Sequence, residues 1–327
     1  MNKKVLIIIG AIVIIILAVL IYSSQKNKSV TDLLASPTPV AITDWANGVV
    51  YDTTNNKIKF FDPSLNSYQD VTSITGEIPT YAELSNDQKT LLYTTDPNAA
   101  SETIEVNPDL SNLKVKSISD GSLAFEQNSI FSPKFLDDES IVYQDFSSTN
   151  SGRIILRSVQ TGQILKWVDI GEKDPVDIYV LDQSHIICTQ YSSDVGEVSS
   201  KLVNLNSLEI IDYINGEGLQ FSTVYGSPYV ASQTVSANKF SISLIKWQTK
   251  ENVLSLDIPL EQLTWDVDGK NVYYIENNQI IQKDLTSQNQ KVLQKVSPSG
   301  APSLQMLLGG DLLLKTEQET SVIDLPI

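Results

Sequence analysis

One short pattern returns along most of this chain of 327 residues and limits the folds open to it. It is a run of three apolar or β-favouring residues, and the third residues of successive copies are 42, 50, 45, 43, 43 and 40 positions apart. The copies are Val49-Val50-Tyr51, Leu91-Leu92-Tyr93, Ile141-Val142-Tyr143, Ile186-Ile187-Cys188, Tyr229-Val230-Ala231, Val272-Tyr273-Tyr274 and Leu312-Leu313-Leu314. This spacing, with short strand-like runs and no long helical periodicity, is typical of a β-propeller and argues against a helical solenoid.

Each copy predicts one blade of four antiparallel strands, named a to d from the axis outward. In the sixth unit we expect strands over 263–265, 272–275, 279–283 and 291–296, with a hairpin at Asn277-Asn278. The chain ends in the third strand of the seventh unit, and residues 29–34 are expected to supply the fourth, which would close the ring without an exposed edge. The predicted fold class is all-β, a seven-bladed propeller over residues 40–327.

The N-terminal region predicts a membrane anchor. Residues 5–21 are an unbroken run of apolar or glycine residues, which as a helix would span about 26 Å of a bilayer. The alternative is a cleaved signal peptide, but the apolar run is long for one and residues 18–24 offer no good cleavage site. We therefore expect residues 1–28 to hold a cytosolic stub, a single transmembrane helix and the start of a tether. Residues 29–39 would be a linker, and the acidic domain would lie outside the cytoplasm at the cell membrane.

The turn before the second strand points to a family. Ser85-Asn86-Asp87-Gln88-Lys89 and Asp266-Val267-Asp268-Gly269-Lys270 resemble the Ser-Pro-Asp-Gly-Lys turn of TolB-like and WD40-like propellers, and residues 136–140 match more loosely. The resemblance extends over about residues 40–327, although no unit has a Trp-Asp ending. It implies the architecture and no particular activity, because functions within these families differ widely.

Composition excludes several function classes. The chain has 39 acidic and 23 basic residues, a net charge of −16, which disfavours sequence-independent binding to nucleic acid or anionic lipid. One cysteine and one histidine exclude an intramolecular disulfide and a Cys/His zinc site. We therefore assign no cofactor, no metal and no nucleic-acid partner.

Individual residues offer little chemistry. Cys188 stands where four other units have tyrosine, so we expect it buried in a strand, and His185 is expected to lie exposed in the preceding turn. Residues 266–271 resemble a calcium loop, but they lack its distant glutamate and a β-turn explains them. The four tryptophans are expected to pack between blades; they are Trp45, Trp167, Trp247 and Trp265. No catalytic residue is assigned.

Loop lengths single out one sector of one face. From strand b to the corner after strand c, units 2 to 5 need 14, 15, 16 and 15 residues, against 11, 10 and 10 in units 1, 6 and 7. Strand alternation places these b–c loops on the same face as the connections between blades, of which 119–129 is expected to be the longest. The candidate binding residues in the loops are Asp96, Asp120, Phe125, Glu126, Asp145, Phe146, Tyr191, Asp194 and Glu197.

The sequence therefore predicts a noncatalytic, membrane-tethered recognition or assembly module. An acidic, partly aromatic loop surface would suit a basic protein, a peptide or a glycan, although long loops can also be merely solvated. The alternative class is a carbohydrate-active hydrolase or lyase that uses axial Asp and Glu residues, which needs no histidine. A purely structural spacer is a third reading.

Overall fold

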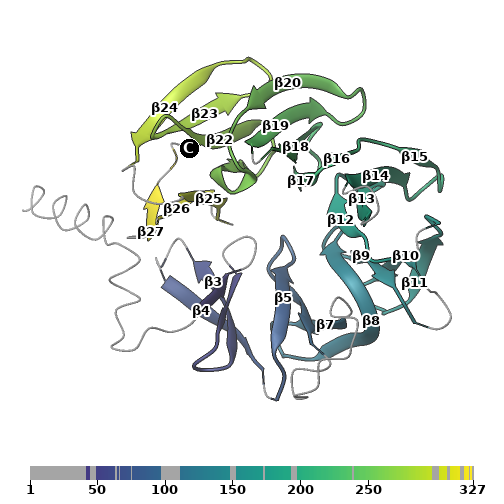
Figure 1. Cartoon of the computed structure of the whole chain (residues 1–327). Helices are drawn as coiled ribbons and strands as arrows, with labels where there is room; N and C mark the ends of the chain where they lie inside the picture. The colour runs from purple at the N-terminus through teal and green to yellow at the C-terminus, as the bar shows by residue number, and fades with distance from the viewer. Residues whose placement is uncertain are drawn as a thin grey trace, which may run out of the picture.

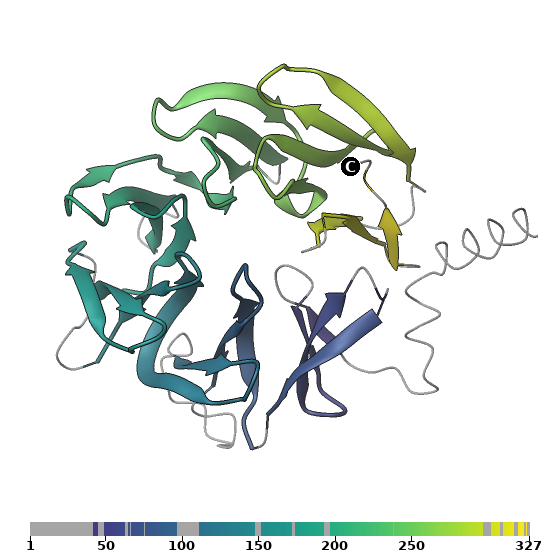
Figure 2. The same cartoon turned by 180° about the vertical axis from the view of Figure 1, so that it is seen from behind.

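Antiparallel strands are the main elements of the described part of the chain. In a computed structural model, the structure describes residues 42–44, 49–62, 65, 67–74, 76–96, 111–147, 152–171, 174–192, 197–237, 239–296, 302–307, 310–316, 320–323 and 325. Over these residues the strands are joined by turns and by one 3-10 turn, η2 (Leu260–Gln262). The sheets follow one another around a common centre (Figure 1), and the view from behind shows the last sheet beside the first (Figure 2).

The strands form six sheets over the described residues. The first contains β1 (Ile42–Asp44), β2 (Val49–Asp52), β3 (Lys57–Asp62) and β4 (Ser67–Ser73). A seven-stranded sheet follows, with β5 (Pro79–Leu84), β6 (Thr90–Thr95), β7 (Ser111–Ser117), β8 (Leu123–Phe135), β9 (Ser140–Asp145), β10 (Arg153–Ser158) and β11 (Ile164–Val168). The third contains β12 (Asp177–Val180), β13 (His185–Ser192), β14 (Glu197–Asn204), β15 (Ile210–Asp212) and β16 (Gly216–Glu217).

Three smaller sheets complete the chain. The fourth contains β17 (Gln220–Thr223), β18 (Tyr229–Ser236), β19 (Lys239–Lys246) and β20 (Glu251–Leu256). The fifth contains β21 (Leu263–Trp265), β22 (Asn271–Glu276), β23 (Gln279–Asp284) and β24 (Gln290–Lys295). The last contains β25 (Ser303–Met306), β26 (Leu312–Lys315) and β27 (Thr320–Ile323).

All seven copies of the repeated apolar run lie in strands, namely β2, β6, β9, β13, β18, β22 and β26. Their three core residues are buried in each case. The reason is that both faces of these strands are covered by neighbouring sheets, so polar and apolar positions need not alternate. In β9 every residue from Ser140 to Asp145 is buried. The repeat predicted from the sequence is confirmed.

The sixth unit follows the prediction closely. Its four predicted strands are β21 to β24, with ends that differ by a residue or so. Asn277 and Asn278 connect β22 to β23 with φ of 50° and 59°, the left-handed conformation that a two-residue hairpin requires and that asparagine tolerates well.

Buried apolar clusters join neighbouring sheets. One cluster combines Tyr51 of β2 with Tyr93 of β6, and comparable clusters occupy each later junction between successive units. A further cluster packs Phe61 of β3 against Leu307 and Leu313, so the first sheet contacts the last. Apolar burial, the main favourable term in folding, therefore continues around the whole arrangement.

The second unit departs from the sequence-based assignment. The predicted connection 119–129 is wrong: Asp120 and Gly121 form a tight turn between β7 and β8, in which the Gly121 N–H donates to the Ser117 carbonyl (3.0 Å). Strand β8 then runs on for 13 residues. Its first half pairs with β7 and its second half with β9, and irregularities between Ser111 and Leu113 and between Phe131 and Lys134 accompany the change of partner. One strand thus serves as the outer strand of one unit and the inner strand of the next.

Other single-residue predictions had mixed outcomes. Cys188 is buried in β13 and Trp265 in β21, as expected. Trp167 lies on β11 but is exposed, because β11 is an outer strand; Trp247 is buried just after β19. His185 is the first residue of β13 and is half-buried, since its ring packs against Trp247.

The membrane-anchor prediction falls outside the described residues. The same holds for the stub and tether (1–28), the linker (29–39), the proposed closing strand (29–34) and Trp45. In the described ranges, no helix has the length and hydrophobicity that a membrane span requires.

Candidate functional site

Two kinds of connection share one side of the molecule. Because the strands alternate in direction, the links from second to third strands emerge on the same side as the links from one unit to the next. We call this side the loop face. Its described parts include the ends of the β13–β14, β18–β19 and β22–β23 hairpins and the connection from β20 to β21.

Five of the predicted site residues lie on the loop face. Asp96 follows β6 and is exposed, and Tyr191 and Glu197 are exposed near the tip of the β13–β14 hairpin. Phe146 follows β9 and is half-buried, with its N–H donating to the Ser129 carbonyl (2.8 Å). Asp145, the last residue of β9, is buried, and its Oδ1 accepts a hydrogen bond from the Ser147 N–H (2.8 Å). Asp145 therefore has a structural role in the turn.

Three others lie elsewhere. Asp120 is in the β7–β8 turn, on the opposite side, where its Oδ1 accepts hydrogen bonds from the N–H and hydroxyl of Ser122. Phe125 and Glu126 belong to β8; the Arg157 guanidinium lies 4.6 Å from the centre of the Phe125 ring. The structure thus does not gather these three with the rest. Asp194 lies outside the described residues.

The extra length predicted as loops in units 4 and 5 is mostly strand. The β13–β14 ladder continues to the pair Ser192 and Glu197, and the β18–β19 ladder to Ser236 and Lys239. The short strand β16 pairs with β14 and also contacts β18, so it connects the two projecting hairpins. A side chain at Gly216 would lie 2.9 Å from the Thr234 methyl group, which explains a glycine there. The β13–β14 and β18–β19 hairpins therefore project side by side on the loop face, with β16 between them.

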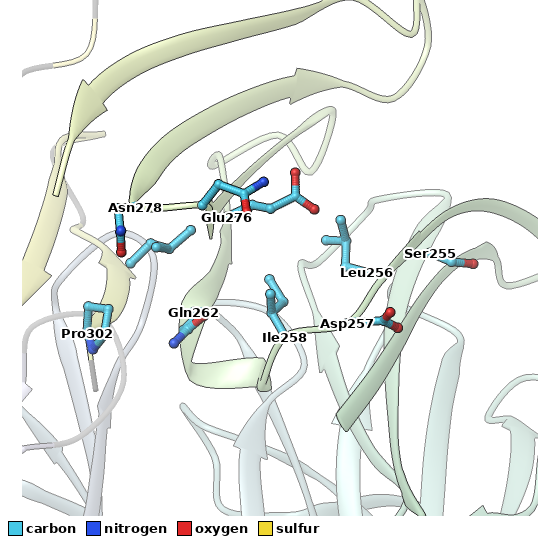
Figure 3. A pocket seen from close by; sticks show the side chains of 10 residues that line it. Ser255, Leu256, Asp257, Ile258, Gln262, Glu276, Asn278 and Pro302 are labelled. Atoms are coloured by element: carbon cyan, nitrogen blue, oxygen red, sulfur yellow. The ribbon is translucent and has the colours of Figure 1, made fainter. Parts of the chain in front are cut away.

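A cleft opens on the loop face beside these hairpins. It has a volume of about 620 Å³ and is bounded by the end of β20, by η2 and by the β22–β23 hairpin (Figure 3). Its lining residues are Ser255, Leu256, Asp257, Ile258, Gln262, Ile275, Glu276, Asn277, Asn278 and Pro302. Two sheets therefore contribute to it, and most of its polar groups are carboxylates and amides.

Buried contacts hold the walls of the cleft in place. The Leu260 N–H at the start of η2 donates to Oε1 of the buried Gln233 on β18 (2.6 Å). Across the cleft, the Val296 N–H donates to the Asn278 carbonyl (2.9 Å) and fixes the hairpin against β24. The cleft is therefore preorganised by strands rather than by a long loop.

The cleft carboxylates are free to meet a ligand. Asp257 is exposed and Glu276 half-exposed, and neither has a hydrogen bond or ion pair to another residue of the described ranges. Together with burial, the charge of Glu276 raises the pKa of the neighbouring Tyr274. Negative charge left without a partner in a cleft attracts cations and cationic side chains.

Loop length in the sequence does not mark this cleft. The β22–β23 hairpin is one of the short ones, so a comparison of loop lengths passed over it. The sequence does contain a cluster of carboxylates near it: Asp257 and Glu261 lie in the connection between sheets, and Glu276 precedes Asn277-Asn278. Strand alternation places these segments on one side, but only the structure shows that they enclose a cleft.

Several carboxylates elsewhere accept hydrogen bonds within turns. In the calcium-like sequence, Asp266 Oδ1 accepts from the N–H groups of Lys270 (2.8 Å) and Asn271 (3.1 Å), so it caps a β-turn. Among the described residues, no three His, Cys, Asp or Glu side chains lie close enough to hold a metal. Burial raises the pKa of Cys188 to about 12, so its thiol stays protonated at neutral pH.

A polar network lies between inner strands. Tyr81 of β5 donates to Glu83 Oε2 (3.0 Å), and Lys134 of β8 donates to the Tyr81 hydroxyl oxygen (2.7 Å). Burial raises the pKa of Glu83, while Lys134 and Tyr81 act in the opposite direction. The network joins two neighbouring units near the centre.

Comparisons with known proteins show the fold. No protein-family model and no curated protein matches the chain. Among solved structures, a chain in the crystal structure of the mitotic checkpoint complex is similar with a TM-score of 0.55 and 11% identity, over 86% of this chain and 84% of that chain. The C-terminal WD40 domain of Sif2 gives a TM-score of 0.49 and 12% identity, over 88% of this chain and 98% of that chain. At this identity the first likeness shows the fold alone, and it bears out the predicted resemblance to WD40-like β-propellers in architecture.

Proposed function

We propose that this chain is a membrane-anchored, extracytoplasmic recognition or assembly module without catalytic activity, and that its loop face binds a protein, peptide or glycan partner. The observation that carries the proposal is the cleft beside the projecting hairpins, where Asp257 and Glu276 have no partner in the described ranges. Carboxylates of this kind favour lysine and arginine side chains, so a basic segment of a protein fits best. A glycan is the alternative ligand, because amides and an exposed ring such as Tyr191 suit hydroxyl groups and sugar faces.

The architecture in this proposal is a closed ring of seven four-stranded blades. Seven second strands and a cluster that joins the first and last sheets support it. The last sheet has three strands in the described part of the chain, and a strand from residues 29–34 would cover its open edge. The apolar run of residues 5–21 would then leave the ring next to its closure and anchor it in the membrane.

Binding to an array of ten-residue peptides of varied charge, and to a glycan array, tests the function with the full-length chain in detergent. We expect lysine- and arginine-rich peptides to bind, and a double variant Asp257→Asn/Glu276→Gln to weaken binding by about tenfold, the loss of two partly solvated charge contacts. Added salt should weaken the same interaction.

The matched control is the double variant Asp268→Asn/Glu139→Gln, which removes the same charge from turns on the opposite side. It should bind as the unchanged chain does. Equal losses in both double variants would mean that net charge, and not the cleft, attracts the peptides.

A carbohydrate-active hydrolase or lyase is the second candidate. It is favoured by Glu83, because a buried carboxyl group with a raised pKa is what a general acid needs. Asp177 of β12 is a second inner carboxylate, and both act electrostatically on Lys134. Product release from the glycan array, lost on Glu83→Gln and retained in Asp257→Asn, would establish this function in place of the first.

A further inference from the structure

Strand β11 is an open edge with unusual side chains. It is the last strand of the seven-stranded sheet, and no described strand pairs with its outer side. Ile164, Leu165 and Trp167 on it are 46%, 53% and 50% exposed. Large apolar groups on an unpaired edge are normally avoided, because they invite pairing with another chain.

Charged residues lie on several of the other outer strands. Asp70 lies in the middle of β4, Glu251 begins β20, and Lys291 and Lys295 lie on β24. The one charged residue of β11, Lys166, donates to Asn206 Oδ1 of the next sheet (2.8 Å). The charge of β11 is therefore limited to Lys166, which is hydrogen-bonded toward the next sheet, and its remaining residues are apolar.

A cation without a carboxylate lies beside this edge. The sequence has two arginines, Arg153 and Arg157, and both are on β10. Arg157 has structural partners, since it donates to the Gly162 carbonyl (2.7 Å) and to Gln127 (3.0 Å). The Arg153 guanidinium lies 4.2 Å from the centre of the Trp167 ring and has no hydrogen bond or ion pair in the described ranges.

We propose that β11 is a docking edge for an extended acidic and apolar peptide segment of a partner protein, which adds a strand to the sheet. Main-chain hydrogen bonds would provide pairing, and apolar side chains of the segment would cover Leu165 and Trp167. A carboxylate of the segment would pair with Arg153, near the Val168 end of β11, where β10 and β11 pair Ile154 with Val168.

Charge and edge chemistry together favour this occupant. A second copy that paired its own β11 here would bring no carboxylate for Arg153, because Ile164–Val168 contains none. A lipid surface would cover the apolar groups but would offer no strand to the main-chain N–H and C=O groups of the edge. This edge shares no residue with the cleft and does not depend on the function proposed for the loop face.

A displayed library of linear ten-residue peptides, selected on the full-length chain in detergent, provides the probe. The selected peptides should alternate apolar residues and carry Asp or Glu toward one end. Leu165→Lys should weaken a selected peptide by about tenfold or more, because a lysine on an edge blocks strand addition. Val292→Lys is the matched control, since Val292 is 48% exposed on the outer strand β24, and it should leave affinity unchanged.

Two further variants keep the test independent of folding defects. Arg153→Glu should weaken the acidic peptide and strengthen the same peptide with lysine in place of its carboxylate. N-methylation of every second peptide residue should abolish binding when the methylated N–H groups face β11. It should leave binding intact when they face away from β11.

Three results would overturn the proposal. The first is that selected peptides bind the Leu165→Lys and Val292→Lys chains equally. The second is that the chain forms a dimer that Leu165→Lys dissociates, which would assign the edge to self-association. The third is that phosphatidylcholine vesicles bind through Leu165 while no peptide does.

Discussion

Gly269 shows at the level of single residues why the turn from Asp266 to Lys270 needs a glycine, whereas the similar turn at Ser85–Lys89 has Gln88 at a φ of 56°. It has φ +61°, and a Cβ added to it would lie 2.3 Å from the Cβ of Ser227 in the neighbouring sheet. The Ser227 hydroxyl donates to the Gly269 carbonyl (2.8 Å). A side chain here would be strained and would also separate two sheets, so the turn joins units as well as strands.

Gly269→Ala should therefore lower the free energy of unfolding by about 3 kcal/mol, combining backbone strain with a steric clash. Gly226→Ala is the matched change: φ is +78° and nothing lies within 4 Å of the added carbon, so about 1 kcal/mol is expected. Urea unfolding of both variants measures the difference. Equal losses of unfolding free energy would show that the contact with Ser227 contributes nothing to stability.

At the level of elements, the β2–β3 hairpin depends on one carboxylate. Buried Asp52 accepts hydrogen bonds from the N–H groups of Thr54 and Asn55 (both 3.1 Å), and Lys59 Nζ lies 2.6 Å from its Oδ2. Burial alone would raise the pKa of Asp52, but the hydrogen bonds from Asn55 and Lys59 outweigh it and lower the pKa to about 2. The unfolded chain, with its ordinary pKa of 3.8, takes up the proton first as pH falls.

The stability that Asp52 provides is thus complete above about pH 4 and lost between about pH 4 and pH 2. Asp52→Asn should reduce stability at pH 7 by about 2 kcal/mol, the scale of hydrogen bonds to a buried charge. It should also flatten the fall in stability over that acid range. Urea unfolding at a series of pH values tests this, and parallel curves for the two chains would contradict it.

The elements also show what the sequence could predict. The seven buried strands and the Asn277-Asn278 hairpin were predictable, because they depend on local apolar runs and on turn chemistry. The course of β8 was not, since a strand that changes partner midway leaves no mark in local preference, and the turn at Asp120-Gly121 was taken for part of a loop. The cleft was not predictable either, because loop length does not mark its segments, and only packing of two sheets brings Asp257 and Glu276 to one opening.

At the level of the whole molecule, the junction between the first and last sheets differs from the others. Phe61 is buried there against Leu307 and Leu313, with its ring edge-on to Tyr68 at 5.2 Å between centres. Successive sheets are held together by packing and by the chain that connects them. Over the described residues no chain segment links the first sheet to the last, and the cluster of Phe61, Leu307 and Leu313 packs across their junction.

Phe61→Ala should cost about 3–5 kcal/mol and speed hydrogen exchange selectively in β3 and β26. Phe221→Ala is the matched variant, since Phe221 is similarly buried between two successive sheets and packs edge-on to Tyr179 at 5.5 Å. It should cost a similar amount without local opening at the first and last sheets. Uniform exchange in both variants would show that all junctions open together.

Strand β8 has a mechanical consequence. Because a single backbone lies in two units at once, the pair cannot tilt apart without bending that strand, and no hinge separates them. Motions of one unit relative to the next should therefore occur mainly at the other junctions. A partner that inserts between units should separate β7 from β9 less readily than strands at those junctions.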